Sequence, residues 1–199
     1  MDVLLRKCPN LQELGISIFS DEWYSADICT SGPNLKSLTQ LQLLDICFRG
    51  SNIIISELHL PSNLKELALE VPHLLSVGSL IAGLPCLEYR ELMDWRRESG
   101  EWCLGDITFD KLKFLKLVEL NISRWDASEA SFPQLVTLVI KRCYQLEEIP
   151  LSFADIPTLE QIKLIACYNK SLKASAVKIK EEIKDIQGSD HLNLIIEIH

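Results

Sequence analysis

The sequence predicts an α/β fold: a leucine-rich-repeat solenoid, or horseshoe, with a parallel sheet on its concave face and short helices or turns on its convex face. The pattern Leu-x-x-Leu-x-Leu/Ile recurs along the chain. From Leu41 onward its first positions are spaced by 23, 23, 25, 23 and 24 residues. Periods of about 20–29 residues are typical of leucine-rich repeats. Near the C-terminus the apolar period changes to that of a helix, which indicates a terminal cap.

Each copy of the pattern predicts one short strand. A Leu-x-Leu alternation directs one face of the strand inward, and the first leucine enters the same core as the chain turns into the strand. We call these three apolar residues of each copy its ladder positions. One unit is too small to bury its own apolar face, so neighbouring units must stack. The full copies are Leu11-Leu14-Ile16, Leu41-Leu44-Ile46, Leu64-Leu67-Leu69, Leu112-Leu115-Leu117, Leu135-Leu138-Ile140 and Leu159-Ile162-Leu164.

Two regions depart from this regularity. The first interval is 30 residues, so we expect an insertion within the irregular region 17–40. A degraded copy, Leu87-Arg90-Leu92, opens a second irregular region at 88–111. Arg90 takes the place of a core leucine, and an unpaired buried charge is costly. We therefore expect a register shift or bulge that turns Arg90 outward; the alternative is an arginine buried at the ladder position.

The predicted organisation is leucine-rich repeats over residues 1–170 and a helix-plus-strand cap over 171–199. Brief turns or short helices are expected on the convex side, with 73–82 and 151–155 as candidates, where small and apolar residues lie between the strands. Pro-containing phrases such as FPQL precede several strands, as expected of turns that enter extended structure.

The cap helix is expected over 175–187, because Ala176, Ile179, Ile183 and Ile186 recur at helical spacing. Ser175 is the expected N-cap and Gly188 the expected stop. A last strand should follow, in which the leucines and isoleucines from 192 to 198 alternate. No comparable cap precedes the first repeat, so we expect the protein to continue upstream.

Composition excludes several function classes. The net charge of −8 argues against binding to nucleic acid, which needs clustered Lys and Arg. No apolar run approaches the ~18 residues of a membrane span. The charged start MDVLLRK does not resemble a signal peptide, so a cytoplasmic location is expected. The sequence contains no phosphate loop, His-Glu-x-x-His or Gly-x-Ser-x-Gly motif, so we expect no enzymatic activity.

The cysteines and the acidic pairs have simple structural interpretations. Seven cysteines without a Cys-x-x-Cys pair predict neither a disulfide framework nor a metal site. Cys143 and Cys167 each lie three residues after the last ladder position of adjacent repeats, so they are interpreted as buried packing groups rather than nucleophiles. Glu147 and Glu148 are neighbours that point in opposite directions along an extended chain and are interpreted as solvated charges.

The candidate binding surface is the concave face, which consists of the residues between ladder positions. Tyr89 and Phe114 project from consecutive strands and are the expected anchors. Trp95, Trp102 and Trp125 are candidate loop contacts, because tryptophan is enriched at binding hot spots; packing against convex loops is the alternative. Val139 is also expected to face outward. The full candidate set on the concave face is Lys65, Glu66, Glu88, Tyr89, Lys113, Phe114, Thr137, Glu160, Gln161 and Lys163.

Several phrases resemble one protein family. The phrases FPQLVTLVIKRC, LEEIP, TLEQIKLIAC and SAVKIKEEI, with LPSNLKELAL and WDASEASFPQL, are similar to the C-terminal region of plant intracellular NB-LRR disease-resistance proteins. Within that family the sequence most resembles the coiled-coil class of late blight resistance proteins.

This resemblance implies a non-catalytic module for recognition and autoinhibition. In the family, a coiled coil and an ADP/ATP-binding switch domain precede the repeats, so no cofactor is expected in this chain. The implied partners are the protein's own upstream switch domain and a pathogen effector or its host target. The alternative is the substrate-recognition arm of a plant F-box ubiquitin ligase, which carries similar Leu-x-x-Leu-x-Leu-x-x-Cys repeats.

Overall fold

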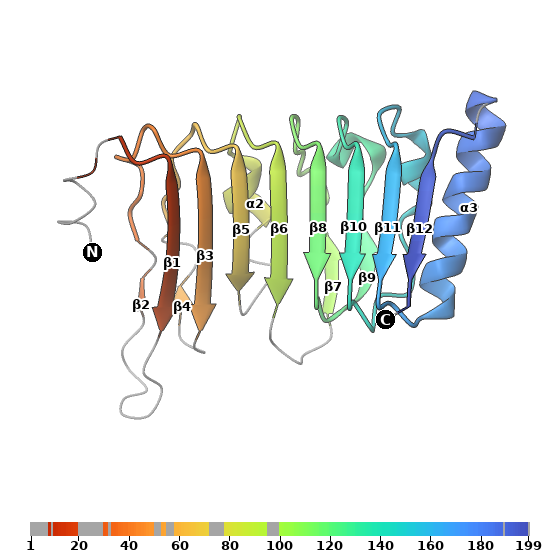
Figure 1. Cartoon of the computed structure of the whole chain (residues 1–199), viewed down its shortest axis with the longest axis horizontal. Helices are drawn as coiled ribbons and strands as arrows, with labels where there is room; N and C mark the ends of the chain where they lie inside the picture. The colour runs from red at the N-terminus through yellow and green to blue at the C-terminus, as the bar shows by residue number, and fades with distance from the viewer. Residues whose placement is uncertain are drawn as a thin grey trace.

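The chain forms a solenoid whose successive turns each add one strand to a main parallel sheet, as predicted (Figure 1). The structure is a computed structural model that describes residues 8, 10–19, 30–31, 33–49, 53–54, 58–71, 78–94, 100–188 and 190–198. The main sheet has eight strands, and neighbours in the sheet follow one another along the chain. These strands are β1 (Glu13–Phe19), β3 (Leu43–Arg49), β5 (Glu66–Val71), β6 (Tyr89–Asp94), β8 (Phe114–Val118), β10 (Thr137–Lys141), β11 (Gln161–Ile165) and β12 (Asn193–Glu197).

The ladder residues lie in register across the sheet. Leu115 on β8 pairs with Leu138 on β10, and Leu138 pairs with Ile162 on β11. All three side chains are fully buried. The predicted repeat register is therefore confirmed. The residues that alternate with them lie on the opposite face of the sheet, which we call the concave face.

The returning segments cover the core side of the sheet. They contain α2 (Gly78–Ala82), η3 (Glu129–Ser131) and η4 (Leu151–Asp155). η4 coincides with the helix expected at 151–155, whereas residues 73–77 of the other expected helix lie outside the described residues. Most of the expected insertion, residues 20–29, also lies outside them. Two small parallel sheets were not predicted: β2 (Thr30–Ser31) with β4 (Ile53–Ile54), and β7 (Gly100–Cys103) with β9 (Ile122–Asp126).

The C-terminal helix begins earlier than expected. α3 spans Lys170–Gln187, and its N-cap is Asn169, whose side chain accepts a hydrogen bond from the Ser171 N–H at 2.9 Å. Ser175 is therefore not the N-cap; it lies inside the helix, where its hydroxyl accepts from the Ile149 N–H at 2.9 Å. Gly188 ends the helix in the left-handed conformation (φ 68°), as predicted. β12 then joins the sheet beside β11 (Figure 1).

Cys143 and Cys167 occupy equivalent positions at the exits of β10 and β11, and both are buried. The Cys143 thiol donates to the Leu117 carbonyl (3.7 Å), and the Cys167 thiol donates to the Ile140 carbonyl (3.4 Å). Each bond reaches the preceding strand of the sheet. Burial raises the pKa of Cys143 to about 12 and also raises the pKa of Cys167, so both thiols are neutral packing groups.

Backbone geometry at the same turns connects successive repeats. Glu119, Arg142 and Ala166 follow β8, β10 and β11 and adopt the left-handed conformation, with φ of 53°, 54° and 50°. Their N–H groups donate to carbonyls at the ends of the next strands, at 2.8, 2.9 and 2.8 Å. The turns therefore satisfy polar groups that the end of each strand would otherwise leave unpaired.

Leu138→Ala should destabilise the chain by about 2–5 kcal/mol, because it leaves a cavity in a fully buried ladder row. Urea unfolding followed by circular dichroism measures the effect. Val136→Ala, a half-buried position just before the same strand, is the matched control and should cost less than ~1 kcal/mol. Equal unfolding midpoints for the two variants would contradict the ladder assignment.

Candidate protein-binding surface on the concave face

The predicted surface residues lie in two rows of the concave face and in the turns just before the strands. Glu66, Tyr89, Phe114, Thr137 and Gln161 lie opposite one another in a single row across β5, β6, β8, β10 and β11. Lys163 is on the next row of the concave face, two residues after Gln161. The remaining four lie just before the strands, where their N–H groups bond to the preceding repeat: Lys65, Glu88, Lys113 and Glu160.

Tyr89 and Phe114 form a stacked pair at the centre of this row. Their ring centroids are 4.5 Å apart and their planes differ by 10°. Both side chains are half-buried. α2, β7 and β9 lie behind the sheet in Figure 1. Tyr89 and Phe114 alternate along their strands with the buried residues Arg90 and Leu115, so their side chains lie on the face opposite the core. A rigid aromatic pair on an open sheet face is the kind of group that dominates binding hot spots.

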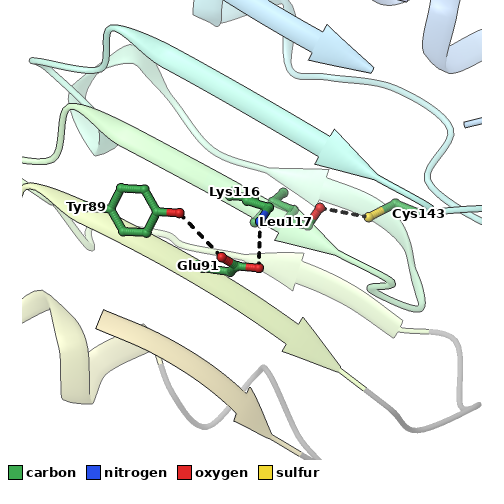
Figure 2. Close-up of polar contacts among 5 residues, drawn as sticks. All are labelled: Tyr89, Glu91, Lys116, Leu117 and Cys143. Carbon is green, nitrogen blue, oxygen red and sulfur yellow. Dashed lines mark hydrogen bonds and ion pairs between the residues drawn. The ribbon is translucent and has the colours of Figure 1, made fainter. Parts of the chain in front are cut away.

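Glu91 holds the tyrosine in place. The Tyr89 hydroxyl donates to one Glu91 carboxylate oxygen at 3.4 Å, and Lys116 approaches the other at 2.9 Å (Figure 2). Partial burial and the neighbouring Glu91 carboxylate raise the pKa of Tyr89, so its hydroxyl stays protonated at neutral pH. The ring therefore has a defined orientation before any partner binds.

Two further ion pairs connect neighbouring repeats on this side of the sheet. Lys113 and Glu88 approach to 2.9 Å, and the hydrogen bond from Lys113 lowers the pKa of Glu88. Lys163 pairs with Glu197 at 2.7 Å. Val139 lies between Lys116 and Lys163 in the cross-strand register, so it faces the concave side as expected, but its side chain is buried there. Long lysine stems cover apolar neighbours in this way.

Trp102 and Trp125 do not contribute to this surface. Trp102 on β7 and Trp125 on β9 are buried on the core side, with ring centroids 5.3 Å apart. Trp125 also packs edge-on against Phe132 and Phe153, at 6.0 and 4.9 Å. Their interpretation as loop contacts is therefore wrong, and the alternative, packing on the convex side of the sheet, holds for both. They lie 23 residues apart, one repeat length, and this spacing was the signal that both occupy a core position. Trp95 lies outside the described residues.

Arg90 is also in the core. It pairs in regular register with Leu67 and Leu115, without a bulge, and is fully buried. The expectation of an outward-turned arginine is therefore wrong. Its guanidinium carbon lies 4.8 Å from the Phe109 ring centroid and 5.8 Å from that of Trp102, and aromatic faces attract a cation. Its nitrogens have no hydrogen-bond partner within the described part of the chain, and burial lowers its pKa to about 9.

The described residues provide neither a metal site nor a membrane-spanning helix. Those residues contain no group of three or more His, Cys, Asp or Glu side chains that could hold a metal ion. Among the described helices, none combines the length and the apolar character needed to cross a membrane.

Comparison with known proteins gives the family. No family model matches the chain. Over its whole length the chain is 31% identical to late blight resistance protein homolog R1B-23 and 31% identical to homolog R1B-13, both from Solanum demissum. Over 98% of its length it is 27% identical to late blight resistance protein R1-A from the same species. The chain is a homologue of late blight resistance proteins.

This late blight resistance homologue corresponds to only part of its relatives. It spans 16% of the length of R1B-23, 17% of the length of R1B-13 and 15% of the length of R1-A. The resemblance in its leucine-rich repeats is thus confirmed along the whole chain. The relatives give no support to the F-box ubiquitin-ligase alternative.

Proposed function

We propose that this late blight resistance homologue is a non-catalytic recognition module of a plant immune receptor, and that it binds protein partners through its concave face. The names of its relatives support a role in disease resistance. The stacked Tyr89–Phe114 pair carries the proposal for the surface, because two half-buried aromatic rings face away from the core at the centre of the sheet.

The proposal extends to autoinhibition. In the unstimulated receptor the concave face would hold the receptor's own switch domain, and a pathogen effector or its host target would compete for that contact. Such competition requires differential affinity for two states of the receptor. Any ADP or ATP site would then lie in the switch domain rather than in these repeats, and the receptor would act in the cytoplasm.

Combining Tyr89→Ala with Phe114→Ala should weaken partner binding at least ~10-fold, because truncation removes the central anchors of the surface. The probe is the remainder of late blight resistance protein R1-A, and its binding to this chain is measured by biolayer interferometry. The circular dichroism spectrum should be unchanged, since neither ring belongs to the buried ladder.

The matched control combines Tyr144→Ala with Tyr168→Ala. These tyrosines also stack, at 6.1 Å, but they are exposed at the exits of β10 and β11. The control should retain the affinity of the original chain. Equal affinities for both double variants would show that the concave aromatic pair is not the anchor.

A further inference from the structure

The concave face is divided by charge. Among the side chains that the structure describes on this face, the charged ones of β3, β5 and β6 are all acidic: Asp45, Glu66, Glu70 and Glu91. On β8, β10 and β11 they are all basic: Lys116, Lys141 and Lys163. The sign changes between β6 and β8, where Glu91 and Lys116 form an ion pair at 2.9 Å and where Tyr89 stacks on Phe114.

Ala68 lies at the centre of the acidic half. In the parallel register it is opposite Asp45 on β3 and Glu91 on β6. Glu66 and Glu70 precede and follow it by two residues on β5, on the same face. Neighbouring strands are about 4.8 Å apart, so four carboxylates surround one short side chain. Ala68 itself contributes only a methyl group, which is half-buried.

These four carboxylates differ in their contacts. Glu91 is engaged by Tyr89 and Lys116, and Glu70 accepts a hydrogen bond from the Cys47 thiol at 2.9 Å. Asp45 and Glu66 are exposed and make no hydrogen bond or ion pair with their side chains in the described portion of the chain. Two carboxylates are thus available to a partner, and the other two add negative potential around them.

Tyr89 supplies the second recognition element. One face of its ring stacks on Phe114, and the residue opposite it on the other side, on β5, is Glu66. A planar cation over this part of the sheet can contact an aromatic face and a carboxylate together. Arginine suits both contacts better than lysine, because its guanidinium stacks on rings and pairs with a carboxylate through two parallel hydrogen bonds.

We propose that the acidic half of the concave face binds a protein segment that presents arginine, with one guanidinium between Glu66 and Tyr89 and a second basic group at Asp45. This rests on the proposed function and names the chemistry of its partner. The lysines of β8–β11 repel the same segment, so the charge division also sets its position along the sheet.

The test uses two fluorescein-labelled peptides of equal length, one with arginines spaced by glycine and serine and one with glutamates in their place. Fluorescence anisotropy should show binding of the arginine peptide, and amide chemical shifts in β5 and β6 should change on its addition. Combining Asp45→Lys with Glu66→Lys should weaken binding at least ~10-fold. Binding should also weaken between ~0.05 and ~0.5 M NaCl, because exposed charges are screened.

The control variant is Asp155→Lys, which reverses one acidic charge at an exposed position of η4 on the core side, half the charge change of the double variant. It should bind the arginine peptide like the original chain. Unchanged affinity in the Asp45/Glu66 variant, or equal losses in both variants, overturns the proposal. Binding of the glutamate peptide to β8–β11 instead also overturns it, yet leaves the concave face as a binding surface. The proposed function is tested separately, by whether the variant that combines Tyr89→Ala with Phe114→Ala loses binding to the remainder of R1-A.

Discussion

Arg90→Leu should stabilise the chain by about 1–4 kcal/mol, measured as the difference in free energy of unfolding in urea. Leucine restores the ladder residue between Leu67 and Leu115. It also removes a fully buried guanidinium whose nitrogens lack hydrogen-bond partners among the described residues. The rings of Phe109 and Trp102 offset only part of that cost, since a desolvated cation–π contact contributes about 2 kcal/mol.

The gain should depend on pH. Burial lowers the pKa of Arg90 from its ordinary 12.5 to about 9. Between these values the unfolded chain binds a proton that the folded chain has lost, so the stability of the original chain rises with pH in this window. The advantage of Arg90→Leu should therefore be full below pH 9 and shrink above it. The difference between the two proteins cancels other titrations, including that of Cys143, whose raised pKa acts in the opposite direction.

Arg142→Leu is the matched control, because it removes an exposed arginine whose only described ion pair is with Glu119 at 3.0 Å. Exposed pairs contribute little, so its effect should stay within ~1 kcal/mol and show no such pH dependence. A loss of stability in Arg90→Leu would mean that the guanidinium makes a net favourable contribution in the core.

Trp125→Ala should destabilise the chain by about 3–5 kcal/mol, the range for truncating a large buried aromatic side chain. Trp125 contacts Trp102, Phe132 and Phe153, which come from three different segments of the core side. Its removal therefore leaves a cavity that no single neighbour can fill. Guanidinium unfolding with intrinsic fluorescence or circular dichroism measures the loss.

Trp125→Phe is the matched variant. The buried indole nitrogen of Trp125 has no hydrogen-bond partner in the described structure, so phenylalanine keeps much of the ring contact and removes an unpaired donor. We expect a loss below ~1.5 kcal/mol. Equal losses for alanine and phenylalanine would indicate that packing of the larger indole ring, rather than aromatic contact in general, stabilises this cluster.

Much of the fold was predictable from spacing alone. The leucine period placed Leu115, Leu138 and Ile162 in one buried row, and the structure confirms that row. The same alternation placed Tyr89 and Phe114 on the opposite face as neighbours. Both results follow from one local rule: successive residues of a strand face opposite sides, and a unit too small to fold alone must stack on its neighbours.

The outcome at Arg90 could not be derived from local pattern, and for Trp102 and Trp125 the only signal was their spacing of 23 residues. The cost of burying an unpaired charge predicted that Arg90 lies outside the core. The strand register instead places it between Leu67 and Leu115, and the rings of Phe109 and Trp102 lie beside its guanidinium. In the sequence, Trp102 and Trp125 resembled surface anchors. In the structure β7 pairs with β9, and this pairing places the two rings against each other.

Leucine spacing is therefore sufficient to establish the solenoid, its parallel strands and the two faces of its sheet. The solenoid follows from the repeat of about 23 residues, and the two faces follow from the alternation of residues within each strand. Which side chains meet depends on tertiary structure. The stacking of Tyr89 on Phe114, the four carboxylates around Ala68 and the burial of Arg90 all join residues from different repeats, about 23 residues apart. Such contacts exist only after the repeats stack, so packing between repeats decides where charge and aromatic surface gather.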